Sequence, residues 1–121
     1  MTVIFAFAFG LAFGSFANVA IDRIAQGKAL GGRSSCDACG RVLRWWELVP
    51  VASYIALRGR CGGCGHAIGL RTPAVELACG LVFAALYATT PPPAAVAVFA
   101  GLLLTLIACG ALLGRRERAH G

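Results

Sequence analysis

The order of apolar and polar residues divides the chain into two long apolar stretches separated by a polar loop. The first stretch, residues 2–21, contains no charged residue. About 20 helical residues, at a rise of about 1.5 Å each, match a hydrocarbon core of about 30 Å, so this pattern predicts a membrane-spanning helix. A cleaved signal peptide is the alternative, but no basic segment precedes the stretch, which is also longer than the apolar region of a signal peptide.

The second apolar stretch, residues 74–113, is too long for one spanning helix and is interrupted by the three prolines 91–93. Because proline cannot continue a helix, we expect a hairpin of two helices, covering about residues 73–90 and 94–113. The predicted fold class is therefore an all-α membrane protein with three transmembrane helices. Its segments are the first helix in residues 1–24, a loop in residues 25–73, and the hairpin with a basic tail in residues 74–121.

Composition supports a membrane location, since 59% of the residues are hydrophobic and only 13% are charged. The net charge of +6 does not indicate a nucleic-acid partner, because the basic residues mark one side of a membrane. Three of the eleven follow the last helix, and the others lie between the first and second apolar stretches. The positive-inside rule then places the loop and the C-terminus in the cytoplasm and the N-terminus outside, in a bacterial inner membrane.

Four cysteines in the loop have the spacing of a zinc ribbon. Each pair, at residues 36–39 and 61–64, has two intervening residues and a following glycine that can adopt positive φ. We expect structural Zn²⁺ on Cys36, Cys39, Cys61 and Cys64; a closed set of four thiolates leaves no position for a catalytic water. Iron and a pair of disulfides are the alternatives, although a cytoplasmic loop keeps its thiols reduced. His66 is interpreted as a loop residue rather than a fifth ligand.

The segment between the cysteine pairs, residues 41–60, mixes arginines and aromatic residues with aliphatic ones. Trp45, Trp46 and Tyr54 suit the headgroup region and the arginines suit anionic lipid, so we expect this segment to lie on the bilayer. The alternative is that its aliphatic residues form the hydrophobic core of a ribbon.

Helix one carries small and polar residues at three- and four-residue spacing: Gly10, Gly14, Ser15 and Asn18. Such a stripe predicts close helix packing, and a substrate helix is the alternative occupant. Glu76, near the cytoplasmic end of helix two, is either a structural carboxylate paired with a neighbour such as Arg71 or a functional group.

Several motifs occur together, in order, within residues 9–87. They are GSFANVAIDR at 14–23, the two cysteine pairs, WELVP at 46–50, LRGRC at 57–61 and PAVE at 73–76. This combination resembles the N-terminal half of bacterial prepilin peptidases of the peptidase A24 family, the leader peptidase/N-methyltransferases of type IV pilus and type II secretion systems.

The resemblance implies a membrane enzyme that removes the leader from prepilins and then methylates the new N-terminal amine with S-adenosylmethionine. It implies that the cysteine loop serves methyl transfer and helps to present pilin-like leader peptides. Gly14, Asn18, Arg23 and Gly59 are then the candidate substrate-binding residues, and Glu76 is the candidate catalytic base.

The sequence departs from the family where peptidase chemistry is concerned. Its only aspartates, Asp22 and Asp37, do not resemble the catalytic motifs, and residues 106–110, where the first catalytic aspartate is expected, contain none. We therefore expect no peptide cleavage by this chain alone, and predict a separate aspartate-bearing peptidase subunit as a partner. The basic tail is interpreted as the end of a short natural protein. The competing functions are an N-methyltransferase in its own right and a non-catalytic zinc-ribbon membrane adaptor.

Overall fold

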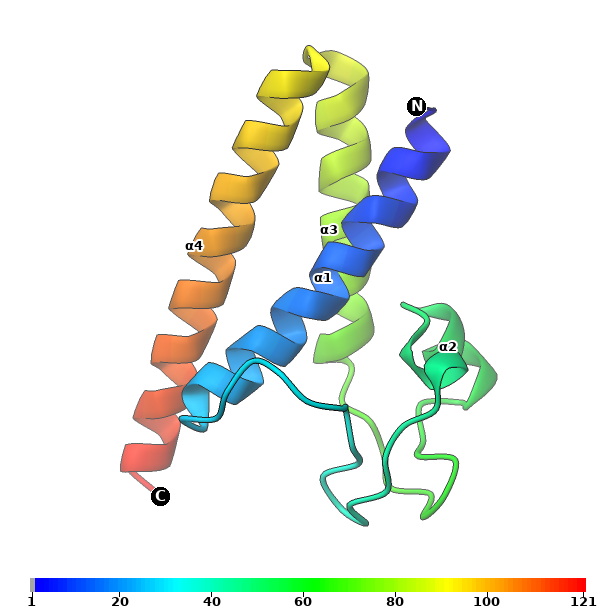
Figure 1. Ribbon diagram of the computed structural model, residues 1–121, viewed down its shortest axis with the longest axis vertical. Coiled ribbons are helices and arrows are strands. Elements are labelled where there is room, and N and C mark those ends of the chain that lie inside the picture. The colour runs from blue at the N-terminus through cyan, green and yellow to red at the C-terminus, as the bar shows by residue number, and fades with distance from the viewer. Residues whose placement is uncertain (1) are drawn as a thin grey trace.

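A computed structural model describes residues 2–121 of the protein and is all-helical. Three helices are long and apolar enough to span a membrane, α1 (Val3–Ala25), α3 (Arg71–Thr89) and α4 (Pro92–Ala119), which confirms the predicted fold class. Helices α3 and α4 form a hairpin, and α1 crosses it at an angle (Figure 1). The loop adds a 3₁₀ turn, η1 (Trp45–Leu48), and a short helix, α2 (Ala52–Ala56), neither of which the sequence pattern predicts.

Helix α4 is longer at both ends than the sequence pattern predicts. Proline determines its start, and arginines favour its extension at the end. Helix α4 begins at Pro92 rather than near residue 94, because the fixed φ of proline suits the first turn of a helix. It also continues beyond residue 113 to Ala119, through the basic tail. Arginine favours helix and complements the negative end of the helix dipole, and Arg115 also donates to the carbonyl of Ile24 in α1 at 3.3 Å.

Helices α1 and α3 touch backbone to backbone at the predicted stripe of small residues. A Cβ added at Gly10 would lie 2.5 Å from the carbonyl oxygen of Cys79, and one added at Gly14 would lie 2.8 Å from the Cα of Glu76. Neither contact leaves room for a side chain, so glycine sets the distance between the two helices. Above the crossing, the rings of Phe83 and Phe99 pack with centroids 4.5 Å apart and join α3 to α4.

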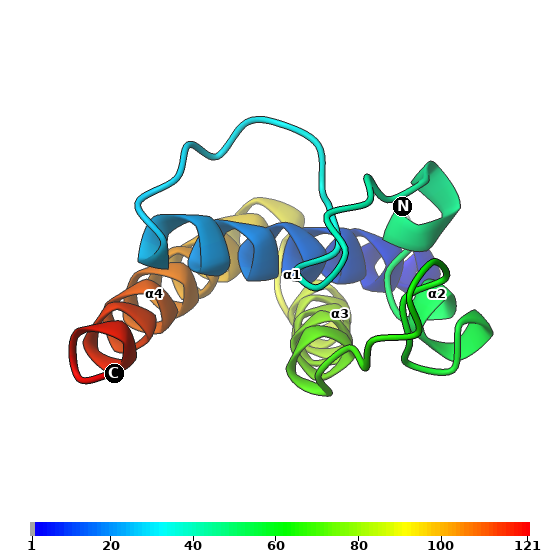
Figure 2. The same ribbon diagram turned by 90° about the horizontal axis from the view of Figure 1, so that it is seen from below.

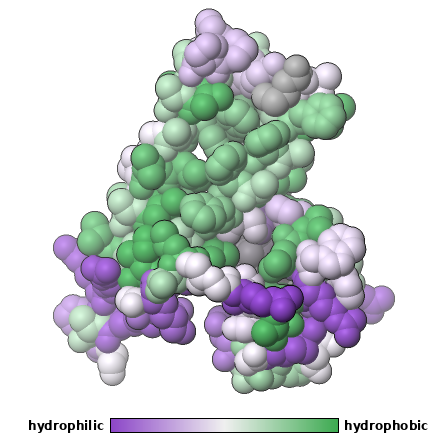
Figure 3. Space-filling view, viewed as in Figure 1, coloured by the Kyte–Doolittle hydropathy of each residue, from purple (hydrophilic) through white to green (hydrophobic). Residues whose placement is uncertain are grey.

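Hydrophilic residues collect at one end of the bundle. An apolar band covers the helices, and polar residues lie below it, at the cysteine loop and at the C-terminus of α4 (Figure 3). Seen from this end, α1 lies across the hairpin, and the loop leads from the end of α1 to the cysteine turns and α2 (Figure 2). The loop and the C-terminus therefore lie at the same end of the bundle.

Candidate metal centre

The cysteine pairs lie in two tight turns that have matching backbone hydrogen bonds. In the first turn, the N–H of Cys36 donates to the carbonyl of Arg41 at 2.9 Å, and the N–H of Gly40 donates to the carbonyl of Cys36 at 2.9 Å. In the second turn, the N–H of Gly65 donates to the carbonyl of Cys61 at 3.0 Å. The two turns thus present their sulfurs in the same manner, which suits a site made of two similar halves.

The glycine after each cysteine pair has the backbone conformation that its position predicts. Gly40 and Gly65 both have φ of +72°, in the left-handed region that side chains with a Cβ rarely adopt. His66 follows the second turn and takes part through its backbone, since its carbonyl accepts a hydrogen bond from the N–H of Cys61 at 2.9 Å.

The four sulfurs form one compact cluster. The Sγ atoms of Cys36, Cys39, Cys61 and Cys64 all lie within 4.8 Å of one another, and those of Cys36 and Cys64 are 3.8 Å apart. Zn–S bonds of about 2.3 Å in a tetrahedron place the sulfurs roughly 3.8 Å apart, so this donor set fits one ion. All four cysteines are free thiols rather than disulfides. Zinc fits such a site, and iron accepts the same ligands.

The electrostatics of the cluster also favour a cation. The backbone N–H groups of Cys64 and Gly63 lower the pKa of the Cys61 thiol to about 6. At Cys64, the N–H of His66 favours the thiolate, but desolvation and the neighbouring thiols outweigh it and raise the pKa to about 11. A cation among the sulfurs would oppose the effect of the neighbouring thiols on Cys64 and favour its thiolate.

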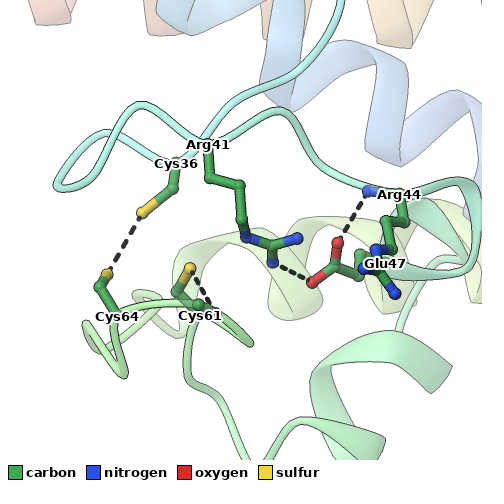
Figure 4. Close-up of polar contacts among 7 residues, drawn as sticks. Cys36, Arg41, Arg44, Glu47, Cys61 and Cys64 are labelled. Carbon is green, nitrogen blue, oxygen red and sulfur yellow. Dashed lines mark hydrogen bonds and ion pairs between the residues drawn. The ribbon is translucent and has the colours of Figure 1, made fainter.

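An arginine–glutamate pair lies beside the cluster (Figure 4). Arg41 Nη2 contacts Glu47 Oε1 at 2.6 Å, and the second oxygen of Glu47 accepts the N–H of Arg44 at 2.7 Å. The Arg41 guanidinium and the Arg44 N–H hold the pKa of Glu47 below its ordinary value, so the pair is ionised at neutral pH. Sequence reasoning missed this pair because a spacing of six residues across a turn carries no helix or strand signal.

Glu76 is buried, with a relative exposure of 4%, and its contact differs from the pairing with Arg71 that was one alternative from the sequence. Its Oε2 accepts the backbone N–H of Val51 at 2.7 Å, while Arg71 pairs with Asp22 at 2.6 Å. Val51 has φ of +57°, a strained value for a β-branched residue. Glu76 therefore ties the loop to α3 at a point where the backbone needs support.

Two of the predicted substrate-binding residues share the α1–α3 contact with Glu76. Gly14 faces the backbone of Glu76, and the buried Asn18 donates through Nδ2 to the carbonyl of Thr72 at 3.0 Å. The Oδ1 of Asn18 has no hydrogen-bond partner in the part of the chain that the structure describes. Asn18 and Glu76 are thus two buried polar residues on the facing helices α1 and α3.

The other two predicted substrate-binding residues have contacts within the loop. The guanidinium of Arg23 donates to a run of carbonyls in residues 29–33, including that of Leu30 at 2.7 Å, and so folds the start of the loop. Gly59 has φ of +68°, and a Cβ there would lie 2.9 Å from the ring of Tyr54. Both residues therefore shape the loop, whichever ligand it binds.

The fold and the cluster together define a membrane protein with a loop on one side of its apolar band whose four cysteines could hold a metal ion. The comparisons with known proteins narrow this class. The family model described as "Bacterial Peptidase A24 N-terminal domain" matches residues 8–90, and the chain belongs to this family. The resemblance seen in the motifs is thereby confirmed.

The curated proteins similar to this chain in sequence include prepilin leader peptidase/N-methyltransferases. The chain is 48% identical over 81 residues to the prepilin leader peptidase/N-methyltransferase of Myxococcus xanthus, covering 66% of this chain and 24% of that protein. It is 38% identical over 138 residues to that of Burkholderia pseudomallei, covering 93% of this chain and 45% of the relative. The chain thus spans less than half the length of these relatives. No solved structure matches it. The apolar helices and these relatives identify a multi-pass bacterial inner-membrane protein.

Proposed function

We propose that this chain is the leader-handling and methyl-transfer module of a prepilin leader peptidase/N-methyltransferase, acting on pilin-like or pseudopilin substrates with S-adenosylmethionine as the methyl donor. The observation that carries the proposal is the family match, which spans the cysteine loop together with the helices on both sides of it. Zinc bound by the four cysteines would supply a closed structural crosslink. The loop between the cysteine turns would then hold a fixed shape beside α3.

Glu76 and Asn18 are the residues of the α1–α3 contact that could meet a substrate amine. The free Oδ1 of Asn18 would accept a hydrogen bond, and a carboxylate oxygen of Glu76 would accept a proton during methyl transfer. Glu76 also accepts the N–H of Val51 and so holds the loop against α3. It would therefore both tether the loop and act as the base.

Peptide cleavage by a pair of carboxylates is assigned to residues outside these 121. Asp22 is paired with Arg71, Glu47 with Arg41, and Glu76 with the N–H of Val51, so three of the five acidic residues have structural contacts. The aspartates would come from further helices, carried by the same polypeptide or by a separate subunit. A non-catalytic adaptor is the outcome expected if neither cleavage nor methylation depends on this module.

A chimera tests the proposed function. Residues 8–90 would replace the matching segment of the Myxococcus xanthus relative, reconstituted in vesicles with a prepilin peptide and labelled S-adenosylmethionine. We expect leader cleavage and methylation of the new amine, read by mass spectrometry. The unaltered relative is the positive control. A chimera that cleaves the leader but transfers no label would contradict the methyl-transfer role, and one that is folded and metal-loaded but does neither would contradict the whole proposal.

We also propose that the cysteine loop faces the cytoplasm and that residues 45–57 lie in the headgroup region of the bilayer. Trp45 is 76% exposed and Ile55 is 69% exposed, although both are apolar. The guanidinium of Arg44 lies 5.0 Å from the centre of the Trp46 ring, an arrangement suited to the interface between lipid and water. Because Val51 is bonded to Glu76 within α3, this segment is held next to a membrane-spanning helix.

Replacing Glu76 with leucine is expected to release this segment from α3, because the N–H of Val51 loses its acceptor. In vesicles, tryptophan emission should be quenched by lipids brominated near the headgroup in the wild type, and less so in Glu76→Leu. Glu76→Gln keeps an acceptor and should retain the quenching while losing methyl transfer. Glu117→Gln, in the exposed tail of α4, is the control. Emission typical of water and insensitive to brominated lipid in the wild type would rule out the bilayer contact.

A further inference from the structure

Arg41 contacts both halves of the cysteine cluster. Its carbonyl accepts the N–H of Cys36 and so closes the first turn. Its side chain crosses to the second turn, where a Cβ added at Gly63 would lie 2.7 Å from Arg41 Nε. Gly63 in turn donates its N–H to the sulfur of Cys61 at 3.4 Å. The guanidinium therefore passes directly over the turn that holds the buried ligand Cys61.

In the described part of the chain, the Nε atom of Arg41 is buried without a hydrogen-bond acceptor. Arg41 Nη2 is paired with Glu47, but Nε is buried and has no hydrogen-bond partner within residues 2–121. A buried N–H without a partner is costly, and such a group calls for an acceptor. Figure 4 shows the side chain of Arg41 extending from the first cysteine turn into the space between Cys61 and Glu47.

We infer that the Nε–H of Arg41 donates a hydrogen bond to the Cys61 thiolate when the metal is bound, which makes Arg41 a positioning residue of the metal centre. Four thiolates around a divalent ion carry an excess of two negative charges, and a guanidinium beside one of them offsets part of that excess. The bond also lowers the energy of the sulfur lone pair and opposes dissociation of Cys61 from the metal. The inference rests on the metal site of the proposed function.

Glu47 sets the orientation that this bond requires. Its side chain is only 4% exposed and is fixed from two directions, by Arg41 at one oxygen and by the N–H of Arg44 at the other. Because the guanidinium is planar and rigid, holding Nη2 on Glu47 also fixes the direction of the Nε–H. Lysine could supply the charge at this position but not a second, rigidly directed N–H.

The test uses the full chain in detergent, loaded with Co²⁺, whose thiolate-to-metal charge-transfer band reports on each sulfur. We expect Arg41→Gln and Arg41→Lys to move this band to lower energy and to accelerate transfer of the metal to a chelator by about 10- to 100-fold. Glu47→Gln, which keeps Arg41 but loosens it, should give a smaller change in the same direction. Arg44→Gln removes the same charge from a neighbouring position and should leave the band and the rate unchanged.

The outcomes separate this inference from the metal site itself. A wild-type protein that takes up no cobalt or zinc contradicts the metal site. Cobalt-loaded Arg41→Gln with the band and release rate of the wild type contradicts the hydrogen bond alone. If Arg41→Lys behaves as the wild type, charge rather than a directed N–H acts on the sulfur, and the inference is also overturned. Should Arg41→Gln fail to fold, the band of Glu47→Gln decides, since an unshifted band there would count against the bond.

Discussion

Replacing Cys61 with serine is expected to abolish metal binding and to unfold the loop between α1 and α3, while the three long helices remain. Neither η1 nor α2, all of whose residues the structure describes, contains a buried residue, so the loop has little apolar core of its own. A small segment of this kind depends on its metal for folding, because metal binding and folding share one free energy. Cys61 is the buried member of the cluster, and its loss removes one of the four ligands.

Metal content by mass spectrometry and hydrogen exchange along the chain would measure both effects. In Cys61→Ser, metal should fall from about one ion per chain to background, and protection of residues 25–70 should disappear. Cys109→Ser is the matched control, because Cys109 is an exposed residue of α4 and lies outside the cluster. Protection of the loop that survives in metal-free Cys61→Ser would show that the loop folds through packing instead.

The parts of this structure that the sequence predicts are those determined by local pattern. Three apolar runs of spanning length, a proline break and two Cys-x-x-Cys-Gly turns each depend on residues close together in the chain, and the structure has all of them. The 3₁₀ turn at Trp45–Leu48 and the single-turn helix α2 carry too few residues for a periodic signal.

The tertiary contacts of the site could not be predicted in the same way. The bond from Val51 to Glu76 joins residues far apart in the chain and uses a backbone conformation that is unusual for valine. From the sequence, Arg71 could pair with either Asp22 or Glu76. Only the packing of α1 against α3 selects Asp22. Zinc as the ion, the cytoplasmic side and the substrate-binding residues are predictions from the sequence that the packing of the structure does not test.

Replacing Gly10 or Gly14 with alanine is expected to destabilise the bundle by about 1–3 kcal/mol each, and the pair together by more than either. At both positions the new Cβ would meet backbone of α3, the Cys79 carbonyl at 2.5 Å and the Glu76 Cα at 2.8 Å, and backbone cannot move aside as a flexible side chain can. The two helices would have to separate. Because Glu76 holds Val51, a displaced α3 would also carry the loop away from α1.

Thermal denaturation in detergent, followed by circular dichroism, would measure the loss of stability. Gly101→Ala in α4 is the matched control, since a Cβ at that position would meet no described atom within 4 Å apart from its chain neighbours and the nearby backbone of its own helix. There the higher helix propensity of alanine, about 1 kcal/mol over glycine, should leave stability unchanged or slightly raised. The same propensity gain acts at Gly10 and Gly14, so the net loss understates the steric cost at the crossing. If Gly10→Ala and Gly14→Ala proved as stable as Gly101→Ala, α1 and α3 could not be in backbone contact at these glycines.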